Sequence, residues 1–222
     1  MKRRIIAAAA FTAILLTGCG DKNSEAGGES SASVSSGENA AAATEQPTDR
    51  VPVIEETTDF EYEIIDGSAV IKKYTGNSKD VVVPGEIEGA VVSKIGFYAF
   101  EAKFSVETIT LPETVTIIDE YAFMDCSSLR SINTPESVTA IERGAFVACT
   151  SLESLNIPAN TEYIRQEVFT ACEGLASLTL NNPDLAYEDW GLEELSGLTL
   201  YAPADSAVFA WAQEKGLSVS AL

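Results

Sequence analysis

The sequence contains no histidine, and its 222 residues include only 14 lysines and arginines against 34 acidic residues, which gives a formal net charge of −20. Histidine is the commonest general base and metal-binding imidazole, so its absence excludes Ser-His-Asp hydrolysis, Cys-His chemistry and HExxH zinc sites. The negative charge argues against nucleic-acid binding, because phosphate contacts need clustered lysine and arginine. Apolar residues make up 45% of the chain, which is enough for a packed core.

Aromatic residues are missing from a long stretch near the amino terminus. None occurs between Thr12 and Asp59, although Phe, Trp and Tyr make up 8% of the whole chain. Residues 20–57 are instead rich in Ser, Ala, Glu, Gly, Asn and Thr. Such a segment cannot bury enough apolar surface to offset its ordering entropy. We therefore expect a disordered tether, which as a coil of about 38 residues would span roughly 30–35 Å.

The first residues have the features of an export signal. Three basic residues at positions 2–4 precede the apolar run Ile5–Leu16, which is too short to span a membrane because a spanning helix needs about 20 residues. The run ends in Leu16-Thr17-Gly18-Cys19, which resembles the lipobox of bacterial lipoproteins. The resemblance implies cleavage before Cys19, a diacylglycerol on its thiol and attachment to a membrane of the bacterial cell envelope. The alternative is an ordinary secretory signal that happens to end in cysteine. The predicted organisation is a signal peptide over 1–18, a lipidated cysteine and tether over 19–57, and a domain over 58–222.

Residues 58–222 follow a repeat with a period of 23 residues. Four kinds of position recur at this spacing: a phenylalanine after a small or apolar residue, a cysteine, a proline and an isoleucine. They are Phe100, Phe123, Phe146 and Phe169; Cys126, Cys149 and Cys172; Pro112, Pro135 and Pro158; and Ile95, Ile118, Ile141 and Ile164. Four independent columns at one period indicate a fold in which copies of one structural unit are stacked on each other.

Each unit predicts a short strand followed by further core positions. In the unit that begins at Leu152, Leu155 and Ile157 alternate with polar neighbours, which is the period-two pattern of a strand. Pro158 then ends the strand because it lacks a backbone donor. One unit cannot bury its apolar faces alone. We therefore expect stacked copies to form a solenoid of short parallel strands, with neighbouring strands about 4.8 Å apart.

The pattern L-x-x-I-x-[IL]-P-x-x-V-x-x-I-x-x-x-A-F-x-x-C-x-x resembles the BspA-type leucine-rich repeat of bacterial surface proteins, and the resemblance extends from Phe60 to Leu222. It implies a leucine-rich-repeat solenoid that binds host proteins, neighbouring-cell proteins or surface glycans in adhesion. Three positions depart from the pattern: Lys103 replaces a cysteine, Thr134 replaces the second aliphatic residue of a strand, and Glu167-Val168 replaces a small pair.

The two ends of the solenoid need caps, because a bare end exposes core and strand edges. Asp66-Gly67 between two alternating segments is a strong hairpin signal and predicts an N-terminal hairpin cap. At the other end, Asp205 or Ser206 can begin a helix that runs through Lys215, with Gly216 just beyond it. We expect this short helix to cover the last coil.

Cysteines at positions 126, 149 and 172 invite disulfide or metal interpretations in an exported protein. Their shared repeat position favours a third interpretation, a buried column of small apolar side chains. A zinc site needs four ligands that converge on one point, whereas a column spreads its members along an axis. We therefore expect three buried, reduced thiols and no metal.

Acidic residues cluster at both ends of the domain, at Glu55, Glu56, Asp59, Glu61 and Glu63, and at Asp184, Glu188, Asp189, Glu193 and Glu194. Neither cluster has the spacing of a calcium-binding EF-hand loop, so we interpret both as solvated surface. A further row, Asp119, Glu142 and Arg165, is expected to be a surface charge ladder.

The outward positions of the predicted strands form the candidate ligand face. If Ile109 and Leu111 point inward, two rows of short polar side chains point outward: Thr108, Ser131, Ser154 and Ser177, and beside them Thr110, Asn133, Asn156 and Thr179. These rows either bind an extracellular protein or glycan or simply suit a solvated sheet. Nothing in the sequence supports catalysis or a cofactor. The sequence thus favours a lipid-anchored surface binding protein, and the alternatives are an envelope-structural spacer and a solute-capturing lipoprotein.

Overall fold

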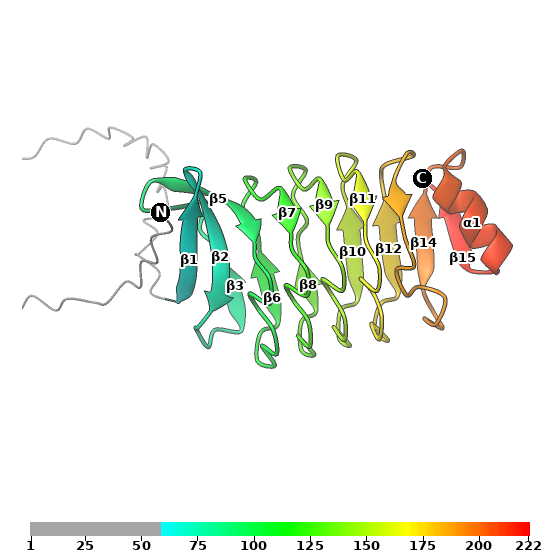
Figure 1. Cartoon of the computed structure of the whole chain (residues 1–222). Coiled ribbons are helices and arrows are strands. Elements are labelled where there is room, and N and C mark those ends of the chain that lie inside the picture. Colours follow the sequence, from blue (N-terminus) through cyan, green and yellow to red (C-terminus); the bar gives the residue numbers. More distant parts are fainter. Residues whose placement is uncertain (1–58) are drawn as a thin grey trace, which may run out of the picture. The chain divides into compact units, whose positions relative to one another are not determined.

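The computed structural model describes residues 59–222, and the predicted signal peptide, Cys19 and the tether lie outside the described residues. The described part is a parallel-strand solenoid of about seven turns with a period of about 23 residues, which confirms the predicted fold (Figure 1). Its elements are β1 (Phe60–Ile65), β2 (Ser68–Tyr74), β3 (Asp80–Val82), β4 (Glu86–Ile87), β5 (Ala90–Ile95), β6 (Thr108–Thr110), β7 (Ile117–Ile118), β8 (Ser131–Ile132), β9 (Ala140–Ile141), β10 (Ser154–Ile157), β11 (Tyr163–Ile164), β12 (Ser177–Leu180), β13 (Ala186–Tyr187), β14 (Thr199–Ala202), α1 (Ala207–Lys215) and β15 (Ser218–Ala221).

The coils build two ladders of strands, whereas the repeat pattern predicts one. The predicted ladder comprises β3-β6-β8 and β10-β12-β14-β15, and we call its outward side the strand face. The second ladder, here called the back ladder, runs β1-β2-β5-β7-β9-β11-β13, with β4 paired to β5. Most of its strands have only two residues, so their pattern is too short to be seen in the sequence. Inward side chains of both ladders, such as Ile109 and Ile118, meet in one hydrophobic cluster.

Strand pairing is interrupted between β8 and β10, so the strands of these two coils do not pair in register as the others do, although the Glu153 N–H still donates to the Arg130 carbonyl at 3.3 Å. Two polar residues follow β8: Asn133 bonds to the preceding coil, and Thr134 bonds across the interruption. The Asn133 side chain accepts a hydrogen bond from the Leu111 N–H at 2.6 Å and donates one to the Leu111 carbonyl at 2.9 Å. The Thr134 hydroxyl donates to the Asn156 carbonyl. Two polar side chains thus supply bonds that backbone groups make in the regular coils.

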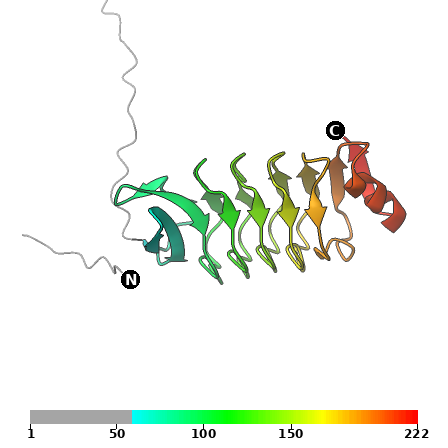
Figure 2. The same ribbon diagram turned by 45° about the horizontal axis from the view of Figure 1, so that its top comes forward.

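A turn after each back-ladder strand carries the phenylalanine column. The Phe100, Phe123, Phe146 and Phe169 rings follow one another along the axis, with centroid separations of 5.2, 5.3 and 6.2 Å. Backbone bonds join these turns from coil to coil; the Phe123 N–H, for example, donates to the Ala145 carbonyl at 2.9 Å. Figure 2 shows the resulting row of stacked turns. All four rings are fully buried, so the column is part of the hydrophobic core.

The predicted N-terminal hairpin is confirmed. β1 and β2 pair antiparallel around Asp66 and Gly67, which have φ of 51° and 83°. The hairpin also extends the aromatic column, because Tyr74 stacks on Phe100 at 5.3 Å and Phe60 lies 5.2 Å from Tyr74. The cap therefore continues the core instead of only covering it.

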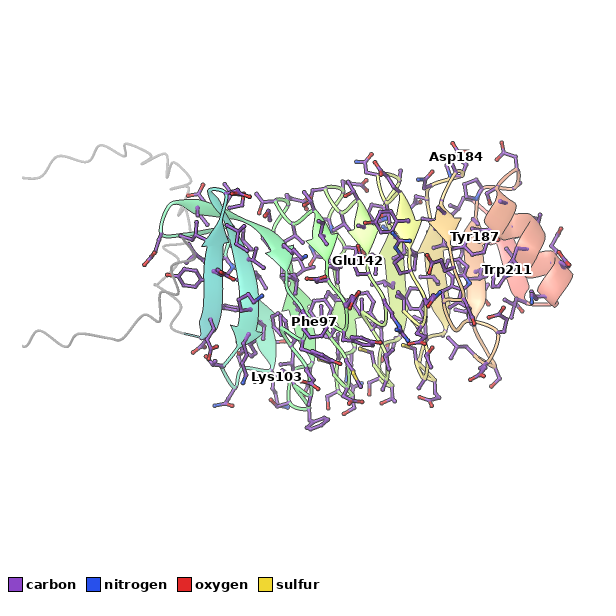
Figure 3. All side chains as sticks on the ribbon, in the orientation of Figure 1. Phe97, Lys103, Glu142, Asp184, Tyr187 and Trp211 are labelled. Carbon is purple, nitrogen blue, oxygen red and sulfur yellow. The ribbon has the colours of Figure 1, made fainter. Side chains whose placement is uncertain are left out.

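The predicted C-terminal helix is also confirmed. The Ser206 hydroxyl caps α1 by accepting from the Phe209 N–H at 3.1 Å, and Gly216 ends the helix in the left-handed conformation. The sequence does not predict the next element: β15 pairs parallel with β14 and adds a strand to the strand-face ladder. The helix thus replaces one back-ladder segment, and Trp211 packs there against Trp190 and Tyr187 (Tyr187 and Trp211 are labelled in Figure 3).

Candidate functional site

The structure places every predicted strand-face residue on the outward side. Ile109, Ile132, Leu155 and Leu178 point inward and are at most 6% exposed, so their polar neighbours point to solvent. The parallel registers bring Thr108 beside Ser131, Ser154 beside Ser177, and Asn156 beside Thr179. The gap between β8 and β10 lies within both rows, so Ser131 and Asn133 are not paired in register with Ser154 and Asn156.

Some of these side chains are already engaged by neighbouring coils. The Thr108 hydroxyl donates to Asp80 Oδ1 at 2.6 Å, and Asn133 uses its amide on the backbone of Leu111. Asn156 Oδ1 accepts from Asn181 Nδ2 at 2.8 Å. The other five predicted members have no side-chain hydrogen bond within residues 59–222, and these are Thr110, Ser131, Ser154, Ser177 and Thr179. The unengaged groups concentrate on β10 and β12.

The structure extends both rows beyond the residues that the sequence identified. Thr199 pairs with Ser177 and Tyr201 with Thr179, and β15 adds Ser218 and Ser220. These residues were missed because their strands follow at offsets other than the 23-residue period. The segment between β12 and β14, and the helical segment before β15, make the spacing between these strands differ from 23 residues. The outward positions of β10, β12, β14 and β15 carry no charged residue.

Ion pairs flank the rows at the N-terminal side of their strands. Lys79 Nζ lies 2.5 Å from Glu107 Oε1, and Arg130 lies 3.7 Å from Glu153. Hydrogen bonding and charge from Glu107 raise the pKa of Lys79. Both pairs are largely exposed, and exposed pairs contribute little to stability because water screens them. The opposite charges of each pair cancel, so the N-terminal side of the two polar rows carries little net charge.

The back ladder carries the predicted charge row. Lys94 Nζ lies 2.7 Å from Asp119, and Arg165 lies 2.7 Å from Glu188 and 3.7 Å from Glu142 (Glu142 is labelled in Figure 3). An open depression between the coils is lined by Glu120, Glu142, Arg143, Arg165, Gln166 and Glu188. It is polar and shallow, and its arginines are held by carboxylates, so it does not resemble an enclosed pocket for an apolar solute.

The three cysteines form the buried column that the spacing predicts. Cys126, Cys149 and Cys172 are free thiols, and each donates a weak hydrogen bond to a phenylalanine carbonyl of the preceding coil, at 3.0, 3.2 and 3.1 Å. Burial raises the pKa of Cys126 and Cys172 to about 12. Burial, with the neighbouring thiols, also raises the pKa of Cys149 well above its ordinary value. The column is structural, because a reactive thiol needs a lowered pKa and access to solvent.

Among the described residues we looked for groups of metal-binding side chains and for helices that could span a membrane. Between Asp59 and Leu222, no group of three acidic or thiol side chains is placed to hold a metal ion. Within that same range, no helix has the length and apolar character to cross a bilayer.

Of the C-terminal acidic cluster, Glu193 pairs with Lys215 at 3.6 Å.

Comparisons with known proteins agree with this architecture. Residues 93–190 match the BspA-type leucine-rich repeat region in six copies, and the repeat region of this chain is therefore of the BspA type. BspA-like leucine-rich repeat proteins are bacterial cell-surface proteins, and their fold is typically a non-enzymatic binding scaffold. A search of curated proteins found none that matches the sequence.

Two solved structures show the same solenoid. The leucine-rich repeat protein of T. pallidum is 27% identical, with a TM-score of 0.61 over 66% of this chain and 71% of that chain. A leucine-rich repeat protein from Bacteroides capillosus is 26% identical, with a TM-score of 0.51 over 60% of this chain and 97% of that chain. The likeness to both proteins extends the evidence for the fold beyond the matched repeats.

Proposed function

We propose that this chain is a lipid-anchored surface protein that binds an extracellular protein or glycan through its strand face and catalyses no reaction. The observation that carries the proposal is the pair of polar rows on β10, β12 and β14, which face solvent in register and bear hydroxyls without partners in residues 59–222. Short side chains lose little entropy when a ligand orders them, so such rows suit repeated hydrogen bonding to an extended ligand.

Attachment to the membrane rests on the signal-like start and on Cys19. Replacing Cys19 with serine is expected to abolish metabolic palmitate labelling and to move the protein from the detergent phase to the aqueous phase, because two acyl chains or more give stable anchoring. Radiolabel incorporation and detergent partitioning of wild type and variant measure this directly. A variant that still labels and stays with the membrane would show that Cys19 is not the anchor.

Binding through the strand face is tested with the double variant Ser154→Lys/Asn156→Lys. The long side chains cover the flat surface without touching the inward residues Leu155 and Ile157, which are at most 3% exposed. Binding to purified extracellular-matrix proteins and to a glycan array is expected to fall at least tenfold. Wild-type binding is expected to persist in about 0.5 M salt, because uncharged hydrogen-bonding groups are not screened.

The matched control is Glu193→Gln/Glu194→Gln, which changes charge in the C-terminal acidic cluster and leaves the strand face intact. It should bind as wild type does. The strand-face assignment is wrong if this control fails while the lysine variant binds normally. The spacer alternative gains support if wild type binds neither the matrix proteins nor any glycan.

A further inference from the structure

Tyr201 is the one large side chain among the outward positions of β10, β12, β14 and β15. It points outward from β14, because its neighbours Leu200 and Ala202 are fully buried on the inward side. The strand registers place Thr179 of β12 on one side of it and Ser220 of β15 on the other. An aromatic ring therefore interrupts a row of short hydroxyl-bearing side chains.

The side chain of Tyr201 is not engaged by the protein itself. Within residues 59–222 its hydroxyl has no hydrogen-bond partner, and no aromatic ring or cation lies against its ring. Other tyrosines are used in the fold: Tyr98 stacks on Tyr121, and Tyr163 has Arg165 over its ring. Tyr201 is half-buried, so its hydroxyl and the exposed part of its ring are available to a ligand.

The distribution of charge around Tyr201 favours an uncharged ligand. The outward positions of these four strands carry no charged residue, although the chain has a net charge of −20. The acidic domain repels an anionic ligand, which would find no lysine or arginine on these strands. A cationic ligand would find no carboxylate there, and Glu153, which precedes β10, already faces Arg130 at 3.7 Å.

The residue types on this surface favour a glycan over a protein. Protein interfaces depend on several aromatic, arginine or aliphatic anchors, and serine and threonine are under-represented among them. Here a single aromatic residue stands among serine, threonine and asparagine. A sugar ring complements both features. Its hydroxyls donate to and accept from the short polar side chains, and its C–H groups suit the electron-rich face of an aromatic ring.

We propose that the strand face binds an uncharged glycan, with one sugar ring packed against the Tyr201 ring. Hydroxyls of that sugar bond to Thr179 and Ser220, and the glycan chain continues along the rows toward Ser177 and Ser154. This inference rests on the proposed function, because it specifies the ligand class of the strand face. It adds Tyr201 as the residue that orients the ligand.

The probes are four uncharged hexasaccharides, namely cellohexaose, chitohexaose, maltohexaose and mannohexaose, each titrated into the full chain by isothermal titration calorimetry. A heparin hexasaccharide and hexagalacturonate serve as charged counterparts. At least one uncharged probe is expected to bind, and its affinity should be the same in about 0.5 M salt, because no ion pair is formed. The charged probes are expected not to bind.

Tyr201→Ser is expected to weaken binding of that uncharged probe about five- to tenfold, because it removes the ring and leaves a side chain like Ser220 beside it. Tyr201→Phe keeps the ring and should weaken binding less. The matched control is Phe104→Ser, which removes a 61% exposed aromatic ring outside both ladders and should bind as wild type does. Melting temperatures verify that all variants are folded.

The inference is overturned if no uncharged hexasaccharide binds, if a charged probe binds as tightly, or if Tyr201→Ser binds as wild type does. The variant Ser154→Lys/Asn156→Lys separates this failure from that of the proposed function. Where matrix proteins bind wild type but not the lysine variant, and no hexasaccharide binds, the strand face is the binding surface and only the ligand class is wrong. Where the lysine variant and Tyr201→Ser both bind every ligand normally, the strand face is not the binding surface.

Discussion

A variant that lacks residues 108–130 is expected to fold and to melt cooperatively, and a variant that lacks only residues 108–119 is expected to be less stable although it keeps more of the chain. The first deletion removes one full period of 23 residues. It joins Glu107 to Ser131, so that Phe100 meets Phe146, Ile95 meets Ile141, and Lys94 meets Glu142 in place of Asp119. Because each coil contacts only its neighbours, stability is approximately a sum over coils and interfaces.

The shorter deletion keeps eleven residues of the coil, among them the buried side chains of Phe123, Cys126 and Leu129. These eleven residues are too few to form a complete coil of the solenoid. They must either leave the solenoid and expose apolar surface, at about 25 cal/mol per Å², or displace the columns that follow. Thermal melting by circular dichroism compares the two variants. A lower melting temperature for the full-period deletion would show that the coils are not interchangeable units.

The second large effect concerns the reactivity of the thiol column. At pH 8, iodoacetamide is expected to leave Cys126, Cys149 and Cys172 unmodified in the native protein and to modify all three in about 6 M guanidinium. The pKa of about 12 for Cys126 and Cys172 lowers the thiolate fraction about a thousandfold relative to the usual value of 9.0. Burial adds steric exclusion to this effect. Peptide mapping by mass spectrometry identifies the modified positions.

The control for this measurement is Ser131→Cys, which places an exposed thiol on the strand face. Its labelling should be fast and should rise about tenfold per pH unit until the ordinary thiol pKa is reached. The native column should stay unlabelled between pH 7 and 9, because this range lies far below the raised pKa values. A native disulfide, or labelling of the column as fast as of the control, would contradict the assignment.

The sequence predicts this fold well wherever one physical constraint recurs at a fixed interval. Phe146 and Cys149 occupy the same environment as Phe123 and Cys126, and identical environments select identical residues. The hairpin and the helix were also predictable, because Asp66-Gly67 and Ser206 act through local backbone geometry. The outward direction of Ser154 and Asn156 followed from simple alternation along a strand.

The remaining features depend on contacts between coils that no local pattern encodes. The back ladder consists of strands such as Ile117–Ile118, whose pairing arises only when the coils stack. The use of the Asn133 amide on the backbone of Leu111 depends on two residues 22 positions apart. No local pattern predicts β15, because it pairs with β14 only across the intervening helix α1, in which Val208 and Ala212 are buried. The stacking of Tyr98 on Tyr121 likewise joins two residues of adjacent coils.

The strands lie across the long axis of the solenoid, and β1 and β15 lie at opposite ends of it (Figure 1). A pull applied at the two ends of the domain therefore acts along the direction of the hydrogen bonds between coils and loads one interface at a time. Such a geometry yields by peeling, not by shearing all strands together. Each coil of 23 residues that detaches releases about 80 Å of extended chain. Under tension, the domain would lengthen in steps of one coil, and each step would absorb mechanical work.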